Sequence, residues 1–412
     1  MIKSETAYRI CGSFAVMMAL CLLATPAEAG GYAQGFQGAQ SAGISGAVTG
    51  RPNLPEAGFF NPAGFTLQDE WGVGIGSSFI FPMVEHQNPE TGRRTRSEVN
   101  GSLPPFLHAF GKYDAFAAGL TLGIPYGAAL QWPDGWAGRF EVTSTNLRVM
   151  EAAPSLAWRP INEFAIAAGP RFVWGDMGFT SAIDFARPGE EGLVELEANG
   201  GGVGAQVGLW GRVYEGLSLG ASWRSAITVD VDGMARFEDV PPEMAEAAHD
   251  TRAATQMVLP HRFALGLAYQ LDMMGVLSLD VEYNRWSANE VFDVRFDSDD
   301  VQDISDPRNW NNTISMRAGV EYVSPIDGLS VRSGIAIEPS PAPEDELTPA
   351  QPSTDRTSMS LGFGYRPAEG VAVDAAYNLL ILDETSSRGQ GFEGVYDGLI
   401  HVFTLGLRLS PM

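Results

Sequence analysis

The stretch Arg356-Thr-Ser-Met-Ser-Leu-Gly-Phe-Gly-Tyr-Arg366 decides the fold, because its side chains alternate between two kinds. Apolar residues occupy every second position from Met359 to Tyr365, and the residues between them are serine or glycine. A period of two is the pattern of a β-strand whose two faces meet different surroundings. The stretch therefore predicts a strand with one apolar face and one face of small or polar side chains.

The same alternation recurs along the chain after residue 69. Clear examples are residues 262–270, 277–284, 314–322 and 371–378. Counting such segments predicts about fourteen strands, an even number as in bacterial outer-membrane barrels. The connections alternate between short ones rich in Gly, Pro, Asn and Asp and long polar ones. We expect the short turns to face the periplasm and the long loops to face outward.

Alternation alone also fits a soluble β-sandwich. Two features favour a membrane barrel. The apolar faces often end in an aromatic residue, as an interfacial girdle requires, and the opposite faces are small or charged, as a lumen requires. The aromatic residues are Trp223, Tyr269, Tyr283, Tyr322 and Tyr365. The sequence thus predicts an all-β fold, a transmembrane antiparallel β-barrel.

The N-terminus has the pattern of a cleaved secretory signal. An apolar core is followed by Ala27-Glu28-Ala29, which matches the small-x-small cleavage site. We therefore expect a signal peptide at residues 1–29. Both cysteines, Cys11 and Cys21, lie inside it, so the mature chain is predicted to have no disulfide and no thiolate chemistry.

Residues 30–68 differ from everything that follows. They are rich in Gly and Ala, hold little charge, and show neither a helical stripe nor a clean alternation. A small-residue segment ahead of a barrel suggests a plug inside that barrel. The predicted domains are therefore a signal peptide at 1–29, an N-terminal hatch at 30–68 and a barrel at 69–412.

The composition argues against several classes of function. With a formal net charge of −24, the chain has little positive charge to neutralise the phosphates of a nucleic acid, so no nucleic-acid partner is expected. The sequence contains neither a His-Glu-x-x-His motif nor a Gly-x-Ser-x-Gly elbow, and no two of its histidines have metal-ligand spacing. We expect no catalytic site, no cofactor and no metal, and hence no enzyme.

Charged residues on the predicted lumenal faces have two interpretations. They either pair across the lumen, since an unpaired buried charge is costly, or one arginine binds a ligand carboxylate. Both signs occur on adjacent strands, which favours pairing. The residues are Arg224, Arg262, Asp280, Glu282, Arg317, Glu321, Arg332, Arg366 and Asp374.

Several motifs point to a known family. Gly58-Phe-Phe-Asn-Pro-Ala-Gly-Phe65 looks like a hatch motif, and Ile124-Pro-Tyr-Gly127 is followed by Trp136-Ala-Gly-Arg139. Further matches follow in order at residues 154–158, 259–269, 332–336 with 340–343, and 354–356. With these motifs the chain resembles the FadL/TodX family of outer-membrane transporters for long-chain fatty acids and hydrophobic compounds, over essentially the whole mature length.

The resemblance implies passive uptake of long-chain fatty acids or related hydrophobic molecules. It further implies that the hatch moves and that ligand leaves sideways through the barrel wall. In the family the Asn61-Pro62-Ala63 tip lies near a kink of strand three, here at Gly123, Pro125 and Gly127. Proline and glycine both weaken a β-ladder, which supports a kink. The alternative is that Pro125 ends the strand at its rim.

Ligand contacts are expected at two places. The hatch residues Tyr32, Phe36, Phe59 and Phe60 are predicted to line a pocket. Trp132 and Trp136, with the apolar Leu130 nearby, are predicted to form an exposed capture groove in an outer loop. A membrane-interface anchor is the alternative for the two tryptophans.

The expected location is the outer membrane, and the expected partners are the hydrophobic ligand, outer-membrane lipids with lipopolysaccharide, and the barrel-assembly machinery. We expect a monomer. The chain ends in Ser410-Pro-Met412 and lacks the terminal aromatic residue that such machinery usually reads. The rival functions are a general aqueous porin and a barrel lipid hydrolase.

Overall fold

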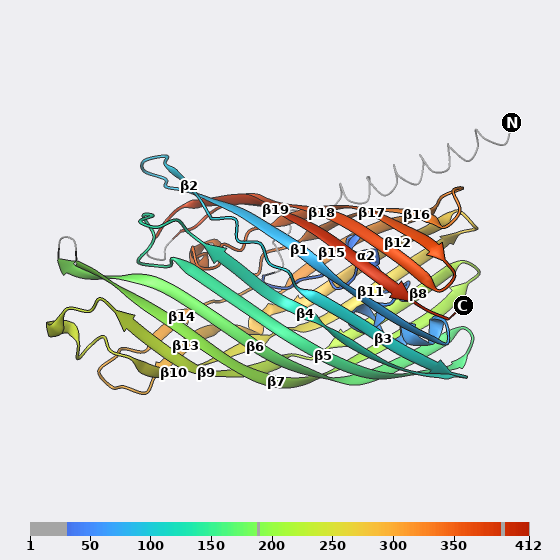
Figure 1. The fold of residues 1–412 in the computed structure, drawn as a ribbon, viewed down its shortest axis with the longest axis horizontal. Helices are drawn as coiled ribbons and strands as arrows, with labels where there is room; N and C mark the ends of the chain where they lie inside the picture. Colours follow the sequence, from blue (N-terminus) through green and yellow to red (C-terminus); the bar gives the residue numbers. More distant parts are fainter. Residues whose placement is uncertain (1–30, 188–189, 389–391, 412) are drawn as a thin grey trace.

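The computed structural model describes residues 31–187, 190–388 and 392–411, and nearly all of them form antiparallel β-strands (Figure 1). The strands are β1 (Trp71–Gln87), β2 (Arg94–Arg96), β3 (Pro105–Tyr113), β4 (Phe116–Gln131), β5 (Ser144–Ile161), β6 (Phe164–Arg187), β7 (Glu190–Tyr214), β8 (Leu217–Arg224), β9 (Ile227–Glu238), β10 (Thr251–Leu259), β11 (His261–Leu271), β12 (Gly275–Arg285), β13 (Val291–Phe296), β14 (Ile304–Pro307), β15 (Thr313–Val323), β16 (Leu329–Glu338), β17 (Arg356–Ala368), β18 (Val371–Ser386) and β19 (Val395–Leu409). Short helices are α2 (Ala39–Ala42), α3 (Ala57–Phe60), η1 (Pro62–Leu67), η2 (Pro242–Met244), η3 (Trp286–Ala288) and η4 (Glu344–Glu346).

Within the described residues a ring of 14 strands closes on itself, which confirms the predicted barrel. The ring closes because β19 pairs with β1, from Val73 opposite Leu409 to Gln87 opposite Val395. The order around the ring is β1, β3, β4, β5, β6, β7, β8, β11, β12, β15, β16, β17, β18 and β19.

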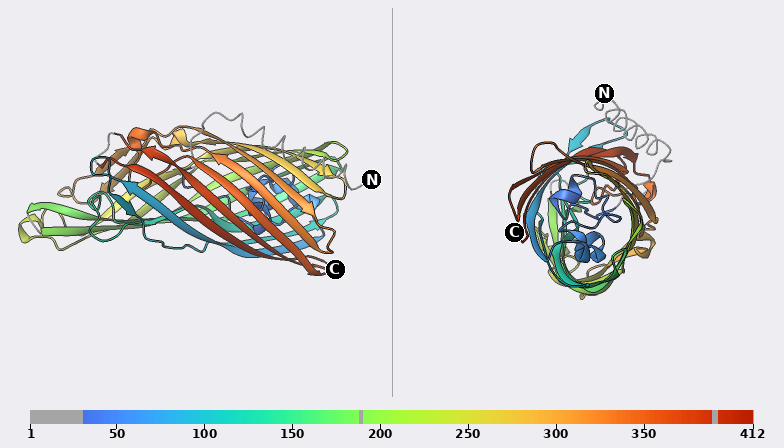
Figure 2. Two further views of the ribbon diagram at one scale, coloured as in Figure 1. Left: turned by 90° about the horizontal axis from the view of Figure 1, so that it is seen from above. Right: turned by 90° about the vertical axis from the view of Figure 1, so that its right-hand side faces the viewer.

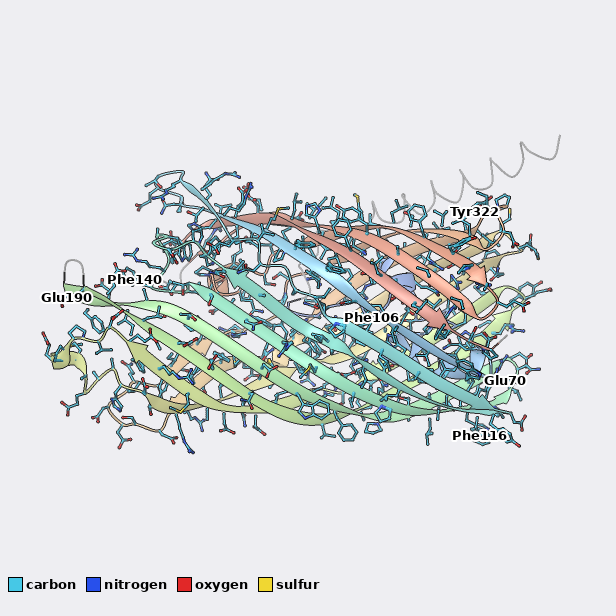
Figure 3. All side chains as sticks on the ribbon, viewed as in Figure 1. Glu70, Phe106, Phe116, Phe140, Glu190 and Tyr322 are labelled. Atoms are coloured by element: carbon cyan, nitrogen blue, oxygen red, sulfur yellow. The ribbon has the colours of Figure 1, made fainter. Side chains whose placement is uncertain are left out.

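The outer face of this ring is apolar. Phe263, Leu265 and Met359, for example, are large apolar side chains, yet they are 45%, 66% and 50% exposed. Side chains project outward from the wall, and the labelled aromatic residues Phe116 and Tyr322 lie at the same end of it (Figure 3). Such a face suits hydrocarbon bounded by an aromatic girdle. No described helix is long and apolar enough to cross a membrane.

The two ends of the barrel differ. Short turns, such as the one between β3 and β4, gather at the end where β19 terminates (Figure 1). At the other end β6, β7, β9, β10, β13 and β14 extend beyond the ring as an outer sheet (Figure 2). Short turns face the periplasm in bacterial barrels, so the outer sheet faces the exterior.

Residues 31–68, hereafter the lumenal segment, lie inside the ring (Figure 2). Nearly every residue from Gln37 to Thr66 is buried. The packing against the wall is close: a Cβ on Gly220 of β8 would stand 1.8 Å from the carbonyl oxygen of Thr49. Only glycine permits this approach. The predicted signal peptide at 1–29 lies outside the described residues.

Candidate ligand-binding site

Strand β4 is irregular where Pro125 interrupts it. Its pairing with β5 shifts register between Gly123 and Tyr126, yet the strand continues to Gln131, so it does not end at Pro125. On its other side, β3 pairs with β4 only as far as Leu122. Among the described residues outside the lumenal segment, the next backbone bond on that side runs from the Glu98 N–H to the carbonyl of Gln131. Residues 123–130 of β4 thus form a wall gap.

The first residues of the lumenal segment fill this wall gap. The Gln34 N–H donates to the carbonyl of Pro125 at 2.8 Å, and the Gly127 N–H donates to the carbonyl of Tyr32 at 2.9 Å. The side-chain amide of Gln37 donates to the carbonyl of Ile124 at 2.8 Å. These bonds satisfy backbone groups that the wall leaves unpaired, as buried backbone groups require.

A cavity of about 370 Å³ lies at the wall gap. Its apolar lining includes Tyr32, Phe36, Ile80, Ile124, Leu130 and Leu380. It also reaches exposed residues on the outside of the wall, among them Leu103 and Asn146. Ligand pockets of this size are typically concave, mostly apolar and furnished with a few polar groups.

Tyr32 links the wall gap to β10 of the outer sheet. Its backbone pairs with β4, while its hydroxyl donates to the carbonyl of Val258 in β10 and accepts from the side-chain amide of Asn289 at 3.0 Å. Its ring meets that of Trp286 edge-on, with the centroids 4.9 Å apart. Burial raises the pKa of the Tyr32 phenol to about 12, so it stays a neutral donor.

The structure places the predicted hatch tip elsewhere. The side-chain amide of Asn61 donates to the carbonyl of Leu209 in β7 at 2.8 Å, and a Cβ on Gly208 would meet Pro62. Asn61, Pro62 and Ala63 therefore lie against β7, and the expectation that this tip faces Gly123–Gly127 is corrected. The part of the lumenal segment that meets the wall gap is residues 32–37.

The four predicted hatch aromatics divide into two pairs. Tyr32 and Phe36 line the cavity. Phe59 and Phe60 instead pack in a separate apolar cluster with Ile44, Val48 and Leu54. The guanidinium of Arg224 stacks 4.3 Å from the centre of the Phe59 ring. This second pair fixes the lumenal segment in place and does not border the cavity.

The predicted capture groove is not exposed. Trp132 and Trp136 are only 1% and 3% exposed, because their rings stack at 4.4 Å and are covered by Phe392 and Tyr396. The indole N–H of Trp132 is satisfied by the carbonyl of Pro349. Their predicted exposure was therefore wrong. Their cluster also contains Leu130, Val84 and Leu382, which line the cavity, so it forms the cavity's roof.

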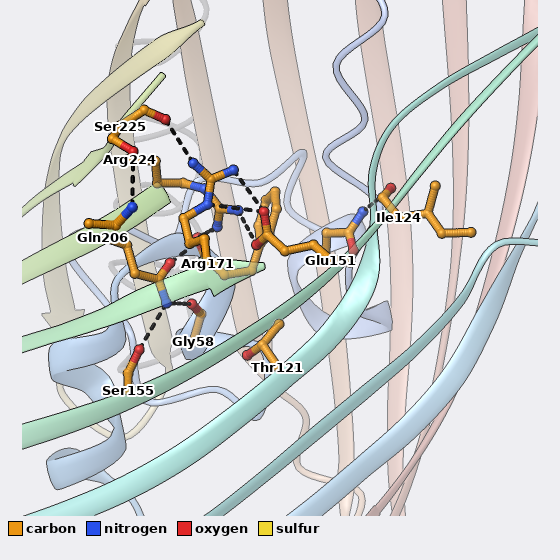
Figure 4. A network of polar contacts seen from close by, with 12 residues as sticks. Gly58, Thr121, Ile124, Glu151, Ser155, Arg171, Gln206, Arg224 and Ser225 are labelled. Carbon is orange, nitrogen blue, oxygen red and sulfur yellow. Dashed lines mark hydrogen bonds and ion pairs between the residues drawn. The ribbon is translucent and has the colours of Figure 1, made fainter. Parts of the chain in front are cut away.

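A buried charge cluster lies beside the wall gap (Figure 4). Glu151, which faces Gly123 across the strand pair, accepts from Arg171 at 2.7 Å and 3.0 Å and from Arg224. Arg224 also donates to the carbonyl of Phe59 at 2.8 Å. The cluster joins three strands of the wall to the lumenal segment. Both guanidiniums share the one carboxylate of Glu151, so each buried charge has an ion-pair partner.

Two further chains of ion pairs run along the inner face of the wall, between strands that lie side by side or one strand apart. One runs Arg262–Glu282–Arg317–Glu338–Arg356, and the other runs Arg51–Glu321–Arg332–Asp374. The predicted pairing between adjacent strands is thus present for most of the lumenal charges. The described residues contain no group of three His, Cys, Asp or Glu side chains that could hold a metal ion.

The sequence matches the family model described as outer membrane protein transport protein (OMPP1/FadL/TodX) over residues 20–408. The chain belongs to this family. Its members are outer-membrane transport channels and not enzymes. A long-chain fatty acid transport protein of Escherichia coli is 22% identical over 87% of this chain and 89% of its own length.

Solved structures share the fold. A Pseudomonas aeruginosa FadL homologue superimposes with a TM-score of 0.82 at 18% identity, covering 92% of this chain and 99% of its own. The Pseudomonas putida toluene transporter TodX superimposes with a TM-score of 0.72 at 15% identity, covering 91% and 98%. At such low identity the likeness concerns the barrel fold alone.

Several residues of this family member's site were not predicted from the sequence. Gln34 and Gln37 bond to the wall gap, and Arg356 lines the cavity. Glu151 and Arg171 were also missed, although each lies on the inward face of an alternating strand. That position was the available signal, because a charge that faces a lumen needs a partner. No local signal marks the two glutamines.

Proposed function

We propose that this protein takes up long-chain fatty acids or related hydrophobic molecules passively across the outer membrane. The cavity is the observation that supports this most. It reaches from the lumen to the outside of the wall, and residues 32–37 lie along one side of it. The relatives support the class of ligand, because their names refer to fatty acids and toluene.

The proposed path has three steps. Ligand first enters the cavity past Leu130. Residues 32–37 next detach from β4, while the Asn61-Pro62-Ala63 turn stays anchored on β7. Ligand leaves sideways between Gly123 and Gly127. Apolar transfer drives binding, at roughly 0.8 kcal/mol for each methylene buried.

A reversible tether tests the movement. Ala33 and Tyr126 form an antiparallel bridge, and their flanking bonds show that they are a non-hydrogen-bonded pair. Such pairs have Cα atoms about 4.5 Å apart, within the range that disulfides span. We expect the double variant Ala33→Cys/Tyr126→Cys, when oxidised, to abolish cellular uptake of radiolabelled palmitate and hexadecanol. Reduction should restore it.

The single variants Ala33→Cys and Tyr126→Cys are the matched controls, because each alters one side chain without forming a tether. Both should transport equally under oxidising and reducing conditions. Residues 31–412 contain no native cysteine to interfere. Undiminished uptake by the fully oxidised double variant would show that residues 32–37 do not move, and would reject this path.

A further inference from the structure

We infer that the cavity selects uncharged hydrophobic molecules and disfavours their carboxylate anions. The inference rests on the proposed function, since it names the class of ligand that the same cavity accepts. Alcohols, esters and hydrocarbons with long chains or rings belong to the favoured class. Ionised fatty acids belong to the disfavoured one. Three features of the described residues lead to this distinction.

The first feature is the charge of the lining. Only Arg148 and Arg356 among the lining residues have ionised side chains, and both already face a carboxylate. Arg148 pairs with Asp176 at 2.9 Å, and Arg356 pairs with Glu338 at 2.7 Å. A ligand carboxylate near Arg356 would lie beside the negative Glu338, and like charges in a poorly hydrated site repel strongly.

The guanidinium of Arg356 also donates to a backbone carbonyl. Its second donor nitrogen bonds to the carbonyl of Ala33 at 3.1 Å, so the guanidinium fork is divided between Glu338 and the lumenal segment. A carboxylate bound end-on, through Nη1 and Nη2, would have to displace the Ala33 carbonyl and would still lie beside Glu338, and one bound side-on, through Nε and Nη2, would have to displace both. The displaced Glu338 would then depend on Arg317 alone.

The second feature is the balance of the ion-pair chain that ends at Arg356. Glu282 and Glu338 lie between its three arginines. Asp280 accepts from the Val48 and Thr49 N–H groups of the lumenal segment and lies directly opposite Arg317 in the pairing of β12 with β15, so it supplies a third carboxylate. Three cations therefore meet three anions, and the chain presents no surplus positive charge to a ligand.

The third feature is the acidic exterior. Residues 291–307, which include β13 and β14, contain six aspartates and one arginine, and residues 236–250 contain five acidic residues and one arginine. Both stretches belong to the outer sheet and its connections. Their field repels an approaching anion and leaves a neutral molecule unaffected.

The remaining polar lining suits a neutral head group. Gln34, Thr145, Asn146, Gln351 and Thr354 contribute amide and hydroxyl groups, which donate to or accept from a hydroxyl or a carbonyl. Such groups fix the orientation of a ligand without requiring it to be charged.

Matched ligands of one chain length test the inference. We would measure equilibrium binding of radiolabelled palmitate, hexadecanol and methyl palmitate to the protein in lipid nanodiscs at about pH 8, with empty nanodiscs as the background. We expect hexadecanol and methyl palmitate to bind roughly tenfold or more tightly than palmitate, because a buried carboxylate without its own counter-ion is costly.

A charge variant provides a second, opposite readout. Glu338→Gln keeps the shape of the side chain and removes its charge, while Arg317 retains Glu282 at 3.1 Å. Arg356 then faces the cavity without its carboxylate, so palmitate binding should rise roughly tenfold relative to hexadecanol. Glu321→Gln is the control, because Glu321 also pairs with arginines but does not line the cavity.

The outcomes separate the inference from the proposed function. Palmitate binding to the natural protein as tightly as hexadecanol would overturn the inference and leave transport intact. An unchanged ligand preference in a folded Glu338→Gln variant would overturn it as well. Failure of all three probes to bind would reject the proposed function, and the inference with it. The comparison in the natural protein remains decisive even if the variant does not fold.

Discussion

Glu56 is a buried carboxyl group of the lumenal segment, and its protonation affects the stability of the folded protein. Its side chain is 2% exposed, and it accepts from the Ser41 N–H at 2.7 Å. No ion-pair partner lies within reach among the described residues. Burial raises the pKa of this carboxyl above its ordinary value of 4.5, and the negative Asp374 adds to the shift.

The raised pKa fixes the sign of a pH dependence. The folded state binds the proton of Glu56 more tightly than the unfolded state does, so the stability from this group is present at low pH. It is lost as the pH rises through the folded pKa. Replacing Glu56 with glutamine removes the charge and keeps the oxygen that accepts from Ser41.

We therefore expect Glu56→Gln to raise the melting temperature in detergent at about pH 8 and to leave it nearly unchanged at about pH 4. Circular dichroism melts of both proteins at the two pH values check this. A variant that melts below the natural protein at the higher pH would show that Glu56 is held ionised by a partner.

At the scale of elements, the backbone of the lumenal segment packs directly against the backbone of a wall strand. A Cβ on Gly220 of β8 would stand 1.8 Å from the Thr49 carbonyl oxygen, an atom of the backbone that has no room to shift. Gly220→Ala should therefore unseat the lumenal segment at a cost of about 1–3 kcal/mol, as for other overpacked sites. Limited proteolysis of residues 31–68 would detect the release.

Gly111→Ala is the control for that experiment. Gly111 also lies in a wall strand, β3, but a Cβ there meets nothing within 4 Å. It tests the effect of adding a methyl group to a strand glycine without touching the lumenal segment. Equal protease resistance of both alanine variants would show that the contact at Thr49 does not hold the segment.

The strands could be predicted from the sequence because their pattern is local. Met359, Leu361, Phe363 and Tyr365 alternate with small residues, and this alone defines β17. The irregular β4 was also visible, since Pro125 cannot donate to a ladder. The segment that bonds to β4 at this irregularity could not be predicted from the sequence. The bonds from Gln34 and Gln37 join residues far apart in sequence, and neither glutamine belongs to a periodic pattern.

The two tryptophans show the converse error. Trp132 and Trp136 flank Pro-Asp-Gly, which predicts a turn, and a turn in an outer loop is usually exposed. Their burial follows from tertiary packing against Phe392, on a different loop, and against Tyr396 at the start of β19. Contacts between loops depend on how the strands bring them together, so the sequence around either tryptophan holds no trace of them.

At the scale of the whole molecule, a closed ring with a filled lumen predicts low conductance. The lumenal segment is hydrogen-bonded or ion-paired to β4, β7, β12 and β15. We expect the protein in planar bilayers to show no large, steady current. Deleting residues 31–68 should open a permanent aqueous pore, because the wall pairs of the ring do not involve that segment.

The same deletion distinguishes the rival porin function. A porin would pass a large, steady current with the segment present, and that result would reject the transport path proposed above. Folding of the truncated barrel is checked by its resistance to denaturation in detergent. The lumenal pairs Arg332–Asp374 and Arg317–Glu338 join wall strands to each other, so they remain when the segment is removed.

The seam between β1 and β19 has a consequence for the order of synthesis. These two strands join the beginning of the wall to its end, from Val73 with Leu409 to Gln87 with Val395. The ring cannot close until β19 has been synthesised, whereas residues 31–68 are synthesised before any strand of the wall. The ring therefore closes around a segment that precedes it in the chain, and that segment either lies in place before closure or enters through an end of the barrel.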